Sequence, residues 1–107
     1  MKITDSTFGL KDGDLKTIVD VLRQYKQISS ALIFGSRTIG NYKPGSDIDI
    51  AIKGKNCNQI THKVYGQLNE ETPLPYKFDI VLYESDNFEL QKHIDEFGVV
   101  IFEQQEE

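Results

Sequence analysis

Three aspartates stand at positions where their spacing could bring them together. Asp47 and Asp49 are separated by one residue in an apolar segment, and Asp79 lies in a later apolar segment, residues 77–83. Side chains alternate between the two faces of a strand, so Asp47 and Asp49 would share one face at about 7 Å from each other. Like charges repel at that distance, and a divalent cation such as Mg²⁺, which prefers carboxylate oxygens, would remove the repulsion.

A candidate anion site precedes these aspartates. Gly35 and Ser36 follow the apolar segment 31–34 and begin a short helical stretch that Gly40 ends. Backbone N–H groups at such a turn suit phosphate, and glycine lets a ligand come close. The Ser36 hydroxyl could add a contact, and the Arg37 guanidinium can hold phosphate oxygens; Arg37 could equally form an ion pair on the surface or at an interface.

Carboxylates that face a phosphate-binding turn are the arrangement expected of a two-metal site. In such a site the metal ions lie about 3.5–4 Å apart and hold the attacking and leaving oxygens. The reaction class is then transfer of a phosphorus-centred group from a nucleoside triphosphate. The chain contains neither GxxxxGK[ST] nor GxGxxG, which removes the P-loop and dinucleotide-binding interpretations.

The elements that must position these residues alternate between helix and strand. Apolar spacing predicts helices at 13–26 and 58–70, a short helix from Gly35, and a further helix that Ser85 and Asp86 could cap and Gly98 ends. Strands are expected at 30–34, 48–53 and 77–83, with 99–102 as a terminal strand or a packed tail. The order indicates an α/β (α+β) fold with a small sheet and flanking helices. If strands 48–53 and 77–83 are neighbours, the three aspartates gather on one face.

Length and composition set the frame for these expectations. The 107 residues suffice for one domain, 1–107, with a loose lead-in at 1–11, anchored by Phe8 and Leu10, and a loose tail at 104–107. Neither a signal peptide nor a membrane span is visible, which favours a cytoplasmic protein. A net charge of −5 without a Lys/Arg cluster argues against tight nucleic-acid binding by the chain itself.

The remaining reactive side chains give weaker signals. Cys57 is the single cysteine, so an internal disulfide is impossible and a cysteine-based zinc site is not expected. His62 and His93 fall on different expected helices, and we expect both to be exposed rather than to act as a base or a ligand.

The spaced motif carries a resemblance. Gly35-Ser36, then ten residues, then Asp47-Ile48-Asp49, with Asp79 in a later strand, resembles the nucleotidyltransferase superfamily with the DNA polymerase beta palm fold. More narrowly, GSRTIGNYKPGSDIDIAI is similar to the minimal nucleotidyltransferases of bacteria and archaea, although Thr38 stands where that family often has alanine. The resemblance implies that Gly35 and Ser36 hold nucleotide phosphates, that Asp47 and Asp49 bind Mg²⁺, and that Asp79 completes the metal site and helps to activate the acceptor hydroxyl.

The same resemblance implies a reaction and a partner. Family members move a nucleoside monophosphate, here AMP from ATP or its equivalent from another nucleoside triphosphate, onto a hydroxyl. Minimal nucleotidyltransferases are commonly paired with a helical HEPN-domain toxin, in some pairs AMPylating one of its tyrosines, so a hetero-oligomer is expected, with a homodimer as the alternative. Two other functions stay open: a small-molecule nucleotidyltransferase similar to the kanamycin-modifying enzymes, and a catalytically silent docking subunit.

Overall fold

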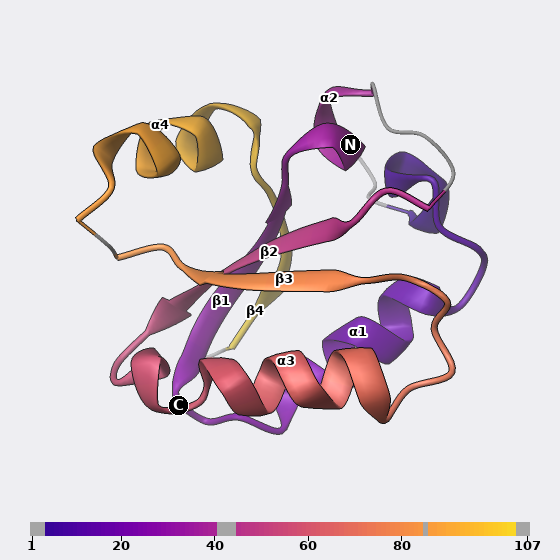
Figure 1. Ribbon diagram of the computed structural model, residues 1–107, viewed down its shortest axis with the longest axis horizontal. Coiled ribbons are helices and arrows are strands. Elements are labelled where there is room, and N and C mark those ends of the chain that lie inside the picture. Colours follow the sequence, from indigo (N-terminus) through magenta and orange to yellow (C-terminus); the bar gives the residue numbers. More distant parts are fainter. Residues whose placement is uncertain (1–3, 41–44, 85, 105–107) are drawn as a thin grey trace.

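A computed structural model describes residues 4–40, 45–84 and 86–104 of the chain (Figure 1). The helices are α1 (Asp14–Arg23), α2 (Ser36–Ile39), α3 (Thr61–Glu70) and α4 (Phe88–Phe97), with short 3₁₀ turns at η1 (Asp5–Phe8) and η2 (Cys57–Gln59). The strands are β1 (Ile28–Phe34), β2 (Ile48–Gly54), β3 (Phe78–Leu82) and β4 (Val99–Glu103). The order of helices and strands agrees with the order expected from the sequence, and segment 99–102 forms a strand.

The four strands form one mixed sheet in the order β3-β2-β1-β4. β1 runs antiparallel to both β2 and β4, whereas β2 and β3 are parallel. The predicted α/β architecture, with a small mixed sheet and flanking helices, is therefore confirmed, and the two aspartate-bearing segments are neighbours in the sheet.

The sheet has two unlike faces. Ile48, Ile50 and Ile52 point to the larger core and are at most 1% exposed. Helices α1 and α3 lie side by side against that face in Figure 1, whereas α4 lies apart from them. The opposite face carries a smaller cluster, made of Leu32, Phe34, Ala51 and Ile94. Each buried isoleucine stabilises the fold by about 1.5–3 kcal/mol, so burial selects the register that turns the isoleucines inward.

The described part of the lead-in, residues 4–11, packs against the rest of the domain. Phe8 is fully buried and Leu10 is 7% exposed, so both side chains anchor it as expected. The Asp5 carboxylate accepts hydrogen bonds from the N–H groups of Leu15 (2.7 Å) and Gly13 (3.3 Å) at the start of α1. The lead-in therefore satisfies N–H donors that have no partner within the first turn of the helix.

The start of α4 differs in detail from expectation. Asn87 caps α4, because its side-chain oxygen accepts the Leu90 N–H at 3.0 Å. The cap expected at Ser85 and Asp86 is therefore wrong by one position, and Ser85 itself lies outside the described residues. Gln104 donates its N–H to the Ser29 carbonyl at 2.8 Å, and the rest of the expected tail, 105–107, is likewise not described.

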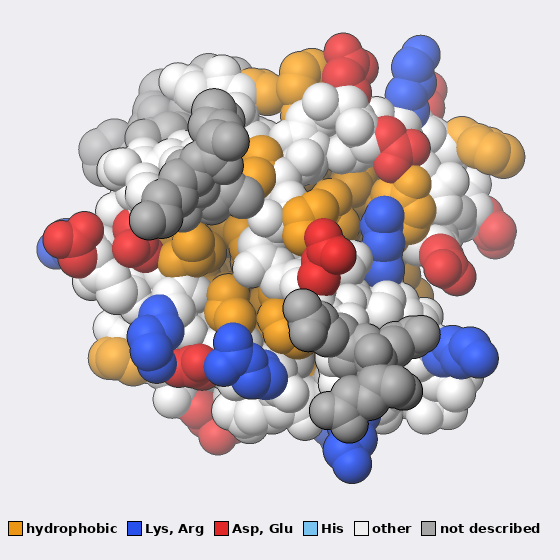
Figure 2. Space-filling view, turned by 180° about the vertical axis from the view of Figure 1, so that it is seen from behind, with side chains coloured by type: hydrophobic (Ala, Val, Ile, Leu, Met, Phe, Trp, Pro, Cys, Tyr) orange, Lys and Arg blue, Asp and Glu red, His pale blue; other side chains and the backbone are white. Residues whose placement is uncertain are grey.

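The surface carries charges of both signs. Figure 2 shows acidic and basic side chains interspersed with apolar ones on the face seen from behind. No helix within the described ranges is long and apolar enough to cross a membrane.

Candidate active site

The sheet brings two of the three aspartates directly opposite each other. Asp49 on β2 is the Cα partner of Asp79 on β3, and on its other side it is the partner of Phe34 on β1. Asp47 lies immediately before β2. Asp49 is half-buried, whereas Asp47 and Asp79 are exposed. The parallel pairing of β2 with β3 thus creates the side-by-side placement that the sequence predicted only conditionally.

The carboxylates disturb one another electrostatically. Burial raises the pKa of Asp49, and the negative charges of Asp79 and Asp47 raise that pKa further, while His93 opposes the shift. Ionised Asp49 is therefore held in an unfavourable setting, and a cation beside it would relieve the strain.

The oxygen atoms of these carboxylates are suitable ligands for a hard cation, but the side chains do not point toward one common position. Carboxylate oxygens are the ligands that Mg²⁺ prefers, and three of them share this end of the sheet. Within the described part of the chain, no group of three His, Cys, Asp or Glu side chains is arranged to hold a metal ion. A shared ion would therefore require the exposed Asp47 and Asp79 side chains to rotate toward Asp49.

The turn after β1 touches Asp49. Gly35 has φ 82° and ψ −152°, a conformation that is essentially restricted to glycine. A Cβ atom at Gly35 would overlap Oδ2 of Asp49. The Thr38 hydroxyl donates to the Gly35 carbonyl at 2.9 Å and so closes the turn. Glycine is therefore required here both by the backbone and by the adjacent carboxylate, and Ser36 follows directly at the start of α2.

Arg37 is placed differently from its neighbours. Its side chain is only 3% exposed and donates to the carbonyls of Phe8 (3.0 Å) and Ser46 (2.8 and 3.3 Å). Its guanidinium also lies 5.2 Å from the centroid of the Tyr76 ring. These contacts tie the lead-in to the segment just before Asp47. They account for the burial of Arg37 without a nucleotide, and they favour a positioning role over the expected phosphate contact.

His93 lies closer to the site than the sequence suggested. The ring on α4 is half-buried, and its centroid is 6.0 Å from that of Phe34, the β1 partner of Asp49. The expectation that His93 is exposed is therefore wrong, whereas His62 is exposed as expected. One signal was available: His93 follows Leu90 by three positions and precedes Phe97 by four, on the apolar side of the helix.

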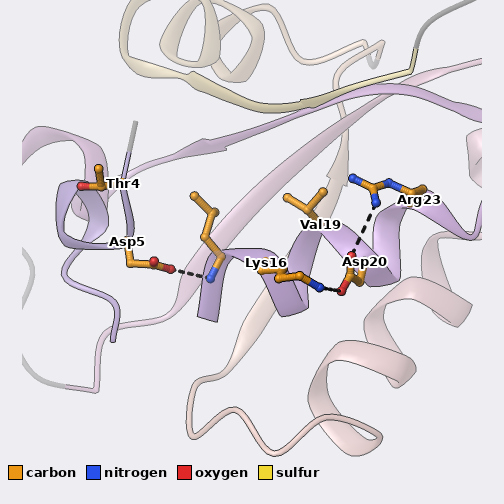
Figure 3. A pocket seen from close by; sticks show the side chains of 7 residues that line it. Thr4, Asp5, Lys16, Val19, Asp20 and Arg23 are labelled. Carbon is orange, nitrogen blue, oxygen red and sulfur yellow. Dashed lines mark hydrogen bonds and ion pairs between the residues drawn. The ribbon is translucent and has the colours of Figure 1, made fainter. Parts of the chain in front are cut away.

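A separate surface hollow lies on α1, away from the carboxylates. It has a volume of about 430 Å³, and Figure 3 shows Asp20 between Lys16 and Arg23, at 2.8 and 3.7 Å, along its wall. Such exposed ion pairs contribute little to the stability of the fold. Because α1 covers the isoleucine face, this hollow belongs to the other side of the sheet from Asp49.

The fold and the site define a class of protein: a small α/β domain whose strand–turn–helix lies beside paired carboxylates on adjacent strands. The family model described as "Polymerase beta, Nucleotidyltransferase" matches residues 16–107. The chain therefore belongs to the polymerase beta-like nucleotidyltransferase family, as the resemblance in its motif implied. No curated protein matches the chain.

Several solved structures of the same fold are described as toxin–antitoxin complexes. A chain of a toxin–antitoxin crystallised with AMP-PNP is 23% identical with a TM-score of 0.72, and the match covers 86% of this chain and 75% of that one. A chain of the MntA–HepT complex is 20% identical with a TM-score of 0.56, covering 84% and 70%. A structure of a tri-AMPylated Shewanella oneidensis HEPN toxin with its MNT antitoxin gives 18% identity and a TM-score of 0.57, again covering 84% and 70%. At these identities the likeness concerns the fold.

Arg37→Ala should lower the free energy of unfolding by about 2–4 kcal/mol, because it leaves the buried Phe8 carbonyl and the partly buried Ser46 carbonyl without their charged donor. Chemical denaturation measures this change. Arg23→Ala, on the exposed side of α1, is the control and should change stability by less than about 0.5 kcal/mol. If Arg37→Ala kept the parent stability, the positioning role would be wrong and the phosphate contact would regain support.

Asp49→Asn should raise the melting temperature in metal-free buffer at neutral pH. The folded-state pKa of Asp49 lies above the ordinary value of 3.8, so its contribution to stability is complete below pH 3.8 and is lost as the pH rises through the folded pKa. The variant should therefore match the parent in acid and exceed it at higher pH. Asp20→Asn gives the opposite sign, because hydrogen bonding to Lys16 lowers the pKa of Asp20. A melting series from pH 3 to 8 tests both variants.

Gly35→Ala should destabilise the fold more than Gly40→Ala. Gly40 also has a positive φ, 84°, but a Cβ there would meet no heavy atom within 4 Å. An alanine in the backbone conformation of Gly35 would lower the free energy of unfolding by about 1–3 kcal/mol, and the overlap of its Cβ with Asp49 would lower it further. In an Asp49→Gly background, Gly35→Ala should cost less. Equal costs in the two backgrounds, measured by denaturant titration, would show that the contact with Asp49 is immaterial.

Proposed function

We propose that this chain is a Mg²⁺-dependent nucleotidyltransferase that moves AMP from ATP onto the hydroxyl of a tyrosine in a HEPN-type partner, and so acts as an antitoxin. The observation that carries the proposal is the β2–β3 register, which places Asp49 opposite Asp79 and against the Gly35 turn. The turn proposed to bind phosphate would thus lie next to the carboxylates proposed to hold the neutralising cation, as transfer of a nucleotidyl group requires.

Each residue has a chemical task in this proposal. Backbone N–H groups after Gly35, with the Ser36 hydroxyl, would hold the triphosphate. Asp47, Asp49 and Asp79 would bind Mg²⁺, for which oxygen donors are suited. Bound Mg²⁺ would neutralise the triphosphate and polarise the reacting phosphorus. Arg37 would keep the segment before Asp47 in place through the Ser46 carbonyl.

The transfer itself balances as a single displacement. The acceptor hydroxyl oxygen attacks the α-phosphorus of ATP, and the bond from that phosphorus to the β-bridging oxygen breaks. Pyrophosphate leaves with the bonding electrons, and AMP stays on the acceptor oxygen. Asp79, which is exposed on β3, would orient the hydroxyl and receive its proton.

Two observations favour a protein acceptor of the HEPN type. Two structures of the same fold are toxin–antitoxin complexes, one with AMP-PNP and one with an AMPylated HEPN toxin. The chain also has a net charge of −5, which would speed encounter with a basic, RNA-binding partner. A small-molecule acceptor and a catalytically silent docking subunit are the competing functions.

The test combines the chain with the protein encoded by the adjacent gene, Mg²⁺ and ATP labelled at the α-phosphate. We expect label on a tyrosine of the partner, located by mass spectrometry. Asp47→Asn and Asp79→Asn should reduce labelling at least a hundredfold, because charge-stabilising groups contribute on that scale. Ser36→Ala should weaken nucleotide binding or turnover while its melting stays close to the parent.

Asp20→Asn serves as the matched control, because Asp20 lies on α1 over the other face of the sheet and should leave labelling unchanged. Complex formation without label, for the parent and a folded partner, would point to a docking subunit. Nucleotide binding with neither complex nor label would instead point to a small-molecule acceptor.

A further inference from the structure

An aromatic cluster lies next to the carboxylates, and the proposed reaction assigns no role to its side chains. The cluster consists of Phe34 at the end of β1 and of His93 and Phe97 on α4. The His93 ring lies edge-on to Phe34 at 6.0 Å and tilted against Phe97 at 5.0 Å, between centroids. Phe34 is the strand partner of Asp49, so the cluster begins beside the central carboxylate.

The cluster runs from a buried end to an open end. Phe34 is 7% exposed, His93 is half-buried, and Phe97 is 37% exposed. The smaller core is closed by other side chains of α4, since Ile94 is fully buried there and Leu90 packs against it. His93 and Phe97 therefore contribute partly open ring surface next to the site rather than the seal of the core.

The position of α4 gives this surface access to a substrate. Asp49, Ala51 and Phe34 belong to the face on which α4 packs, and α1 and α3 cover the opposite face (Figure 1). A substrate held at Asp49 and Asp79 therefore lies on the same side of the sheet as the rings of α4. Aromatic rings prefer offset or edge-to-face contact with other planar rings, and partly exposed ones are free to make it.

We propose that His93 and Phe97 form a stacking surface for a planar ring of a substrate held at the carboxylates. The inference rests on the proposed function, in which two such rings come to the site: the nucleobase of the nucleoside triphosphate and the phenol ring of the acceptor. A stacked ring adds affinity worth roughly tenfold or more. His93 and Phe97 would then set which ring-bearing substrate the enzyme accepts.

The binding test compares AMP-PNP with inorganic tripolyphosphate, each with Mg²⁺, by calorimetry. Both ligands can use the phosphate turn, but only AMP-PNP carries a ring. His93→Leu and Phe97→Leu remove a ring while keeping apolar volume; His93→Phe and Phe97→Tyr keep a ring and guard against a loss that reflects folding alone. Phe88→Leu is the matched control, because Phe88 lies on the same helix, 84% exposed and outside the cluster.

Stacking on the nucleobase predicts that the leucine variants bind AMP-PNP about tenfold more weakly but bind tripolyphosphate as the parent does. The variants that keep a ring should retain the affinity for AMP-PNP. Unchanged AMP-PNP binding with a raised KM for the acceptor protein and unchanged kcat supports stacking on the acceptor ring.

Leucine variants that match the parent for both substrates overturn the stacking proposal, as does an equal loss of tripolyphosphate affinity. In either case a parent that binds AMP-PNP and labels its acceptor leaves the proposed function standing. A parent that binds neither phosphate ligand overturns both proposals together.

Discussion

The register of β2 is the constraint on which the rest of the structure depends. β2 lies between β1 and β3, so its alternation decides what each face of the sheet carries. Ile48, Ile50 and Ile52 are almost completely buried, and a shift by one residue would turn them out and the aspartates in. Burial of the three isoleucines, at about 1.5–3 kcal/mol each, offsets the repulsion that the same register imposes between Asp49 and Asp79.

Contacts from distant parts of the chain hold the carboxylate end of the sheet. Arg37 reaches back to Phe8 and forward to Ser46, and so joins the lead-in, α2 and the approach to β2. Gly35 leaves no room between the turn and Asp49. The Gly35 turn and the carboxylate pair are thus held next to each other, as the proposed positioning of a triphosphate against a cation would require.

The two faces of the sheet differ in role: one contains most of the core that stabilises the fold, and the other carries the candidate site. α1 and α3 cover the isoleucine face, and the main core lies there. The other face has a smaller core under α4, where burial and then the neighbouring carboxylates raise the pKa of Asp49, so that its charge does not stabilise the fold. Unfavourable charge tolerated at one end of a well-packed sheet is typical of sites that bind a cation or a charged substrate.

The sequence by itself determined the order of the elements, the isoleucine face and the candidate residues Gly35, Ser36, Asp47, Asp49 and Asp79, because alternation, glycine turns and apolar periodicity are local signals. It could not decide what Arg37 and His93 contact. A guanidinium suits phosphate and carbonyl oxygens equally, and only tertiary packing brought the Phe8 and Ser46 carbonyls within reach of Arg37. His93 reached Phe34, the strand partner of Asp49, because α4 folds back onto β1, a contact between segments 59 residues apart that no local pattern encodes.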